Sequence, residues 1–325
     1  MKGLAPYIAR RGVQTVLTIF FIIVFNFFLI NLSPGDPATL MAGEYAISDR
    51  VYVQKIRERW GLDKPIFERF LIYLNNLLHG NLGYSYRYMQ SVIDLIAERI
   101  PATLLLTFTS LVIAFILGIL LGMVAARRVN SHLDVGLSFT MLLLYSMPVF
   151  WLGLILILVF SIRLHIFPIA GMMSARIEYK GIWRILDILW HLILPASTLA
   201  LVQMPVYFKI TRASVLEQAT EDYVRTFRAY GFGRVRVFRK YVLRNALLPP
   251  VTVFGLHLGY VLSGAALVEI IFGWPGMGRL LLDAAFYRDY PLLMGLYLIM
   301  AITVSLANFL TDMVYMVLDP RVKYR

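Results

Sequence analysis

The residue types that most often do chemistry are few and scattered in this chain. Cysteine is absent from its 325 residues, which excludes disulfides, thiolate nucleophiles and cysteine-ligated metals. The five histidines show no paired ligand spacing, so no metal site is expected. They are His79, His132, His165, His191 and His257. An intramembrane serine enzyme is also poorly supported, because Ser146, Ser161 and Ser263 have no histidine or aspartate at a recognisable spacing.

The composition indicates what surrounds these residues. Hydrophobic residues make up 59% of the chain and charged residues only 15%. A water-soluble fold cannot bury that much apolar surface, whereas a lipid bilayer accommodates it. Segment 13–32 is long enough to cross the roughly 30 Å hydrocarbon layer. It is too long for a signal peptide and lacks a cleavage site, although Arg10 and Arg11 precede it, so it is expected to remain as the first helix.

Six membrane-spanning helices are predicted, and the loop charges predict their orientation. The segments are 13–32, 103–126, 135–162, 191–213, 248–270 and 292–317. The side that holds both termini carries 17 basic and 5 acidic residues, and the opposite side carries 14 and 13. The net charge of +12 therefore lies on one face, which the positive-inside rule identifies as cytoplasmic. This distribution disfavours a nucleic-acid partner.

The largest insertion, 33–101, is predicted on the opposite side. It begins with SPGDP (33–37), in which two prolines and a glycine end the first helix. Apolar residues then recur at helical spacing in 50–62 and 66–78, with charges between them. Two short amphipathic helices are expected. They either pack together as an extracytoplasmic cap or lie on lipid headgroups.

The cytoplasmic stretch 214–249 is too polar to enter lipid. Its apolar spacing predicts two short amphipathic helices that are broken at Gly231–Gly233. Asp222 is expected to cap the first of them. Two interpretations remain open for this hairpin. It is either a docking element for a partner or an interfacial hairpin on anionic lipid, and composition alone favours the second.

The sequence of this hairpin resembles that of a known family. The string EDYVRTFRAYGFGRVRVFRKYVLRNALLP (221–249) is similar to the EAA-type cytoplasmic loop of binding-protein-dependent ABC importer permeases. The resemblance is to the dipeptide, oligopeptide and nickel branch and covers the chain end to end. Further matching strings are SPGDPA (33–38), GLDKP (61–65), HGNLGYS (79–85), ERIPATL (98–104), SMPVFWLG (146–153), LILPASTLA (192–200), TRASVLE (211–217), FGWPGMGRLLLDA (272–284), RDYPL (288–292) and LDPRV (318–322). Two departures concern the loop itself. Arg225, Thr226 and Phe227 replace the generic Glu-Ala-Ala, and Phe227 and Tyr230 stand where the branch usually has alanine and lysine.

The resemblance implies the fold and the domain organisation. It implies an all-α membrane protein with the type I ABC importer permease fold and an extracytoplasmic insertion after the first helix. The expected parts are the N-terminus with the first span (1–32), the insertion (33–101), the remaining spans (102–317) with the coupling loop 214–247, and a cytoplasmic tail (318–325). The implied location is the plasma (inner) membrane of a prokaryote.

The resemblance also implies a function and partners. The chain would form half of a translocation pathway, and a homologous second permease would form the other half. Two cytosolic ATPases would bind the coupling loops, and an extracytoplasmic binding protein would deliver a peptide, an oligosaccharide or nickel. No G-x-x-x-x-G-K-[ST] string occurs, so this chain should not bind or hydrolyse ATP itself. No cofactor is expected on it, and the resemblance assigns ATP and Mg²⁺ to the ATPases. The alternatives are a self-sufficient channel and, less favoured, an intramembrane enzyme.

The resemblance places the contact with the ATPase between positions 221 and 231. The expected contributors are Glu221, Asp222, Tyr223, Arg225, Thr226, Ala229 and Gly231. Polar residues within spans are the next candidates, because each is costly in lipid. His257, Gln203 and Asn308 are the candidates for facing the pathway. Asn26, Asn31 and Asp312 are further polar residues within spans, and asparagine and glutamine there often only bond between helices.

The loop that precedes the last span contains FGWPGMGRL (272–280). Trp274, Pro275, Gly276 and Gly278 suit a tight or re-entrant turn, which is either a gate at the outer mouth or an ordinary turn. In the second case Trp274 would anchor the turn at the membrane interface.

Overall fold

The computed structural model describes most of the chain, and most of it is helical. The described residues are 4–32, 36–42, 49–59, 61–85, 87–175, 177, 179–259, 261 and 265–318. They fall into two compact units. The terminal unit comprises 1–104, 262–269 and 275–325, and the central unit comprises 105–261 and 270–274.

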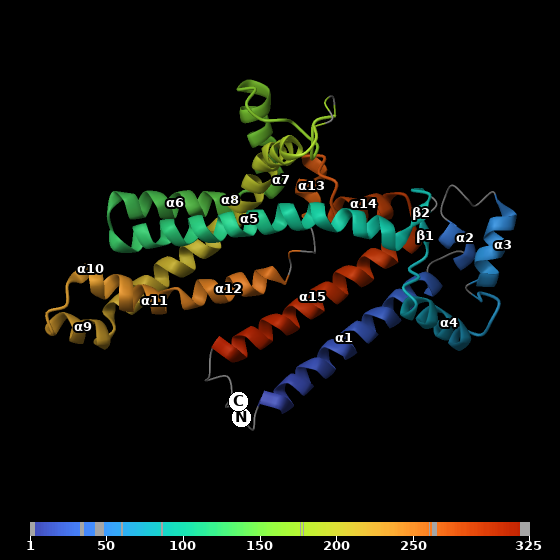
Figure 1. Ribbon diagram of the computed structural model, residues 1–325, viewed down its shortest axis with the longest axis horizontal. Helices are drawn as coiled ribbons and strands as arrows, with labels where there is room; N and C mark the ends of the chain where they lie inside the picture. The colour runs from blue at the N-terminus through green and yellow to red at the C-terminus, as the bar shows by residue number, and fades with distance from the viewer. Residues whose placement is uncertain are drawn as a thin grey trace. The chain divides into compact units, whose positions relative to one another are not determined.

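The terminal unit is built on the first and last long helices, which lie side by side (Figure 1). They are α1 (Leu4–Leu32) and α15 (Tyr290–Leu318). The shorter elements are α2 (Pro37–Ala42), α3 (Arg50–Arg59), α4 (Ile66–Leu78), the antiparallel strands β1 (Tyr84–Ser85) and β2 (Gln90–Ser91), α13 (Ala266–Ile271, as far as Glu269) and α14 (Met277–Phe286). Helix α5 (Val92–Arg127) begins in this unit. Helices α3 and α4 lie where the apolar spacing predicts them.

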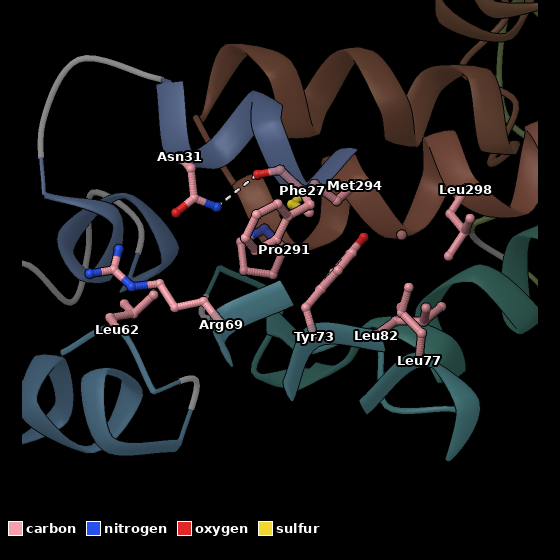
Figure 2. A pocket seen from close by; sticks show the side chains of 11 residues that line it. Phe27, Asn31, Leu62, Arg69, Tyr73, Leu77, Leu82, Pro291, Met294 and Leu298 are labelled. Atoms are coloured by element: carbon pink, nitrogen blue, oxygen red, sulfur yellow. Dashed lines mark hydrogen bonds between the residues drawn. The ribbon is translucent and has the colours of Figure 1, made fainter. Parts of the chain in front are cut away.

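Two apolar clusters hold the terminal unit together. In the first, Phe27 of α1 and Tyr73 of α4 pack with Met294 of α15 (Figure 2). In the second, the start of α5 packs against α14 and α15 through Leu95, Met277 and other buried side chains. Since both clusters join elements that are distant in sequence, the insertion after α1 is anchored to the last helix.

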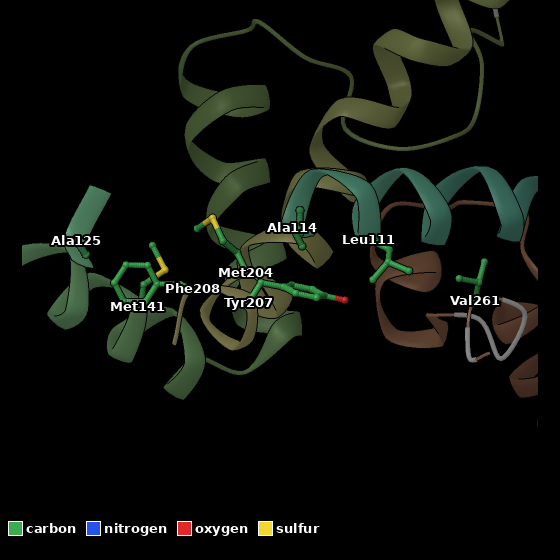
Figure 3. Close-up of a cluster of buried hydrophobic side chains, with 9 residues drawn as sticks. Leu111, Ala114, Ala125, Met141, Met204, Tyr207, Phe208 and Val261 are labelled. Carbon is green, nitrogen blue, oxygen red and sulfur yellow. The ribbon is translucent and has the colours of Figure 1, made fainter. Parts of the chain in front are cut away.

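The central unit is also helical. Its elements are the rest of α5, α6 (His132–Ser146), α7 (Val149–Leu156), the π-helical turn η1 (Ile157–Arg163), α8 (Ile182–Thr220), α9 (Asp222–Ala229), α10 (Arg234–Val237), the π-helical turn η2 (Phe238–Val242), α11 (Leu243–Ala246) and α12 (Leu248–Leu258). Tyr207 and Phe208 of α8 are the largest side chains of its core cluster (Figure 3).

Two glycines determine how closely α5 approaches α8. A Cβ atom on Gly118 would lie 2.9 Å from the Met204 carbonyl oxygen, and one on Gly122 would lie 2.7 Å from the Phe208 carbonyl oxygen. The spacing is the small-x-x-x-small pattern that allows membrane helices to pack backbone against backbone.

The predicted spans are found with two corrections. Among the described residues, four helices are long and apolar enough to cross a membrane, in α1, α5, α8 and α15, and five if one bent pair is counted. The bent pair replaces the single predicted helix 135–162. It turns by 106° between Ser146 and Val149, because Pro148 lacks the N–H that a continuing helix needs and forces Met147 into an extended conformation.

The second correction concerns the predicted span 248–270. In the described residues it is two helices, because α12 ends at Leu258 and α13 begins at Ala266. The prediction of one span rested on hydropathy, which is high for these apolar residues. Hydropathy does not include helix propensity, which is low for Gly255 and Gly259 near the end of α12.

Candidate functional site

The hairpin predicted within 214–249 is built from α9, α10, η2 and α11. Helix α8 ends at Thr220, and Glu221 turns the chain in an extended conformation (φ −63°, ψ 151°) before α9 begins. The prediction that Asp222 caps this helix is wrong. Glu221 occupies the cap position without a side-chain bond, and Asp222 is the first helical residue, where its charge still favours the positive end of the helix dipole.

Helix α9 ends in a Schellman motif centred on Gly231. The Gly231 N–H donates to the Arg228 carbonyl at 3.0 Å, and the Phe232 N–H donates to the Phe227 carbonyl at 3.1 Å. Gly231 has φ +79°, a left-handed conformation that side chains with a Cβ disfavour. The Phe227 and Phe232 rings meet edge to face at 5.6 Å, which is the apolar contact that accompanies this motif. The predicted break is therefore a defined turn.

A small apolar core holds the hairpin together. Val224 of α9, Val237 of α10 and Val242 of η2 are almost fully buried in it. The Phe227 ring stacks on Tyr241 with 3.9 Å between centroids. Phe227, where the branch usually has alanine, thus adds an aromatic ring to the core of the hairpin.

Tyr223 also belongs to this interior side. Its hydroxyl donates to the Gln218 Oε1 at 2.9 Å and accepts from the Asn245 Nδ2 at 3.3 Å. Because these bonds tie α9 to the end of α8 and to α11, Tyr223 positions the helix and is only half exposed.

The other predicted contact residues lie on the exposed side of α9. Asp222, Arg225, Thr226 and Ala229 follow the i, i+3, i+4, i+7 pattern of one helix face, and all four are exposed. Glu221 and Gly231 are exposed at its two ends. We call the four-residue face the α9 stripe. Arg225 and Asp222 form a surface ion pair of 3.6 Å within it, which is worth little to stability and leaves both groups accessible to a partner.

One exposed residue beside this stripe was not among the predicted contact residues. Tyr230, which the sequence marked only as a departure from the branch pattern, is 77% exposed at the C-terminal end of α9. An exposed tyrosine on a short helix is a common anchor in protein interfaces.

The candidates for facing a pathway have separate environments. The His257 Nδ1 lies 2.8 Å from the Tyr207 hydroxyl, and the two rings meet edge to face. Gln203 on α8 and Asn308 on α15 are half-buried. Of the two asparagines of α1, only Asn26 bonds between helices, since its amide donates to the Met294 carbonyl of α15 at 3.4 Å. The Asn31 amide donates within α1 to the Phe27 carbonyl.

The predicted turn at Trp274 is an interior feature. Trp274, Gly276 and Gly278 are buried and Pro275 is half-buried. Trp274 has no exposed surface, so its ring packs within the protein.

A buried carboxylate that the sequence did not single out holds the start of α14. The Glu269 Oε2 accepts from the Arg279 N–H at 2.8 Å, and its Oε1 accepts from the Thr103 hydroxyl at 3.1 Å. The Thr103 hydroxyl in turn accepts from the Met277 N–H at 2.7 Å. A Cβ on Gly276 would collide with the Glu269 carboxylate. Glycine is therefore required there. The N–H groups of Met277 and Arg279, which have no acceptor within the first turn of α14, donate to Thr103 and Glu269 instead.

A second missed pair joins α6 to α8. Arg212 donates to both carboxylate oxygens of Asp134, from Nε at 2.6 Å and from Nη2 at 2.8 Å. The Asn130 N–H also donates to this carboxylate at 3.0 Å. Because the Asp134 side chain is only 3% exposed, this forked pair is a strong and specific connection.

Comparison with known proteins gives a consistent result along the whole chain. Residues 118–324 match the family described as the binding-protein-dependent transport system inner membrane component, and residues 4–107 match the N-terminal region of such membrane components. The chain belongs to this family. The predicted resemblance is therefore confirmed, and so is the interpretation as the permease subunit of an ABC importer.

Several curated relatives of this permease are similar over nearly their full length. The oligopeptide transport system permease protein AppB of Bacillus subtilis is 39% identical over 323 residues, covering 99% of this chain and 100% of its own. The di/tripeptide transport system permease protein DppB of Pseudomonas aeruginosa is 40% identical over 333 residues, covering 98% and 99%. The glutathione transport system permease protein GsiC of Escherichia coli is 38% identical over 320 residues, covering 98% and 99%.

The fold of this permease is similar to that of a solved importer. A chain of the MetNI methionine ABC transporter in an inward-facing conformation superposes with a TM-score of 0.54 at 16% identity, covering 72% of this chain and 98% of that one. At that identity the likeness concerns the fold alone. It supports the helical type I importer permease fold that was predicted from the sequence.

Proposed function

We propose that this permease forms half of a peptide translocation pathway and is driven by two cytosolic ATPases that contact the α9 stripe. The carrying observation is the hairpin itself. Its helix α9 has a buried apolar side, a fixed end at Gly231 and an exposed polar side. A short helix held in this way is suited to seat as a rigid body in a groove of a partner.

The exposure of the α9 stripe supports a narrower contact than the one expected from the sequence. Asp222, Arg225, Thr226 and Ala229 form its face, and Tyr230 is added as an aromatic anchor. Tyr223 holds α9 in place from the inner side. Closure of the ATPases on ATP would then move α9 and shift the pathway between inward-facing and outward-facing states.

The remaining parts of the importer follow from the family and the charge distribution. A homologous permease would complete the pathway, and an extracytoplasmic binding protein would deliver the substrate. The excess of basic residues on the side of the hairpin supports cytoplasmic termini. His257, Gln203 and Asn308 remain candidates for facing the pathway, and the turn of Trp274, Pro275, Gly276 and Gly278 remains a candidate outer gate.

Peptides are the favoured substrate class. The names of AppB, DppB and GsiC specify oligopeptides, di/tripeptides and glutathione, and all three relatives align over nearly their full length. Oligosaccharides and nickel are the alternatives.

Reconstitution tests the function. The complex would be purified from the native membrane, and uptake of labelled di- and oligopeptides into proteoliposomes would be measured with and without ATP. ATP-dependent uptake that is lost when this chain is reconstituted alone supports the proposal. Conduction by the chain alone would support a channel, and titration of the copurified binding protein with peptides, oligosaccharides and nickel would identify the substrate.

Crosslinking tests the coupling surface. The chain contains no cysteine, so Ala229→Cys introduces a single thiol on the α9 stripe. Arg239→Cys places a matched exposed thiol on η2 of the same hairpin. A short crosslinker should join position 229 to an ATPase subunit in the complex and leave position 239 unlinked. The reverse pattern would refute the assignment.

A further inference from the structure

Helix α4 in the insertion has two different apolar faces. One of them is explained by the fold, since Phe70, Tyr73 and Leu77 pack in the cluster with Phe27 and Met294. Figure 2 shows Tyr73 and Leu77 beside Phe27 and Met294 around a single pocket. This face attaches the helix to α1 and α15.

The second apolar face is mostly uncovered within the described part of the chain, since three of its four residues are exposed and the fourth, Leu74, is half-buried. Phe67, Leu71, Leu74 and Leu78 follow one another at intervals of four, three and four residues, which places them on one side of the helix. Phe67 is 69% exposed, Leu71 49% and Leu78 77%. We call these four residues the α4 stripe. A row of large apolar side chains of this kind on a surface requires an explanation.

Polar residues form a third face of the same helix. Glu68 and Asn75 are exposed next to the α4 stripe. The Glu68 carboxylate lies 3.7 Å from the Lys64 Nζ, and the Arg69 Nε donates to the Lys64 carbonyl at 2.6 Å. The helix therefore has one face toward the protein, one apolar face and one charged face.

The attachment of α4 fixes its place beside the end of α1. The Phe27 ring lies 5.2 Å from that of Phe70 and 5.8 Å from that of Tyr73. Phe27 is in the last turn of the candidate membrane span Ile8–Phe28 of α1. Phe25 and Phe28, close to it in the sequence, are exposed large apolar side chains. Helix α4 is thus held beside the last turn of this candidate span.

We propose that α4 is an interfacial helix whose stripe of Phe67, Leu71, Leu74 and Leu78 lies in the acyl chains at the edge of the bilayer. The attachment of α4 beside the last turn of the candidate span would place the stripe where α1 leaves the hydrocarbon layer, and the neighbouring polar face suits the headgroups and water. A binding protein is a less suitable occupant, because it leaves between transport cycles and would return the stripe to water. The insertion is then anchored twice, to α1 and α15 on one side and to lipid on the other.

Site-directed spin labelling in the complete assembly, purified from its native membrane into lipid nanodiscs, tests this inference. Single cysteines at Phe67, Leu71 and Leu78 probe the α4 stripe without a background thiol from this chain. Glu68→Cys and Asn75→Cys are matched controls on the polar face of the same helix. The measurement compares collisions of each label with oxygen, which concentrates in lipid, and with a water-soluble nickel chelate.

Labels on the α4 stripe should collide more with oxygen than with nickel, and this preference should reverse at positions 68 and 75. Labels on the stripe that respond to nickel as strongly as the controls would mean a water-exposed surface and would overturn the proposal. Labels shielded from both reagents would mean that another protein covers the stripe, which would also overturn it. A fluorophore at position 71 should in addition be quenched by lipids brominated near the headgroup. Since the proposal depends on the depth of α4 alone, it stands or falls independently of the substrate.

Discussion

Replacement of Gly231 with valine should separate ATP hydrolysis from transport. Gly231 has φ +79° and closes the Schellman motif at the end of α9. A side chain with a Cβ in this conformation costs about 1–2 kcal/mol, and a β-branched one lies at the upper end. No neighbouring atom lies within 4 Å of a Cβ at this position. The cost is therefore one of backbone strain without steric overlap.

The strain acts on the geometry that presents the α9 stripe. A penalty of 1–2 kcal/mol shifts the balance between the capped and the frayed end of α9 by roughly 5–30-fold. Fraying of this end breaks the contact between Phe232 and Phe227 and so loosens part of the hairpin core. Transport per ATP hydrolysed should fall by up to this factor, whereas membrane insertion should be unchanged because the span helices are untouched.

Gly233 provides the control for this experiment. It is exposed, it has no atom within 4 Å of a Cβ, and its φ of −59° with ψ of 140° is allowed for any residue. Gly233→Val thus adds the same side chain to the same hairpin without strain. ATP hydrolysis and peptide uptake would be measured side by side in proteoliposomes. Normal uptake by Gly231→Val, or an equal loss in both variants, would refute the reasoning.

Three further perturbations test packing, pairing and titration. Gly122→Leu should destabilise the permease by about 1–3 kcal/mol, because its Cβ meets the backbone of α8, whereas Gly136→Leu enters open space and should leave thermal unfolding unchanged. Asp134→Asn should lower the free energy of unfolding by an amount toward the lower end of about 3–5 kcal/mol, because the Arg212 side chain is 29% exposed. The double variant with Arg212→Gln should recover part of that loss in unfolding measurements. Burial raises the pKa of the Asp289 carboxyl above its ordinary 3.8, so the folded chain keeps a proton that the unfolded chain releases. Stability should fall as pH rises from about 4 through the raised value, and Asp289→Asn should flatten this dependence of Tm on pH.

Local periodicity predicted the elements whose burial is decided within a few turns. The spacing of apolar residues located α3, α4 and α9, and the glycines after α9 marked its end. A helix with one buried face shows that face in its sequence at a period of 3.6 residues. The small hairpin was therefore predictable in outline from its sequence alone.

Features that depend on distant residues were not predictable in this way. Glu269 bonds with Thr103, which precedes it by 166 residues, and Arg212 pairs with Asp134, which precedes it by 78. Neither partner has a periodic signal, because each pair meets only after the helices pack. The inward turn of Tyr223 has the same origin, since its hydroxyl partners lie on α8 and α11.

The way in which the hairpin joins the central unit has a consequence for coupling. Helix α9 follows α8 after one extended residue, Glu221, and α11 packs back against α8. Ala246 of α11 lies in one apolar cluster with Val215 of α8. The Asp134–Arg212 fork ties α6 to the same helix. A force on the α9 stripe therefore acts on α8 through two attachments, one at each end of the hairpin, and on α6 through a buried charged pair. Such an arrangement favours movement of these helices as one body over bending of the hairpin alone.

If Asp134→Asn lowers transport per ATP while crosslinking at Ala229 persists, the fork transmits the movement. Unchanged coupling in that variant would assign transmission to the covalent connection and the α11 contact.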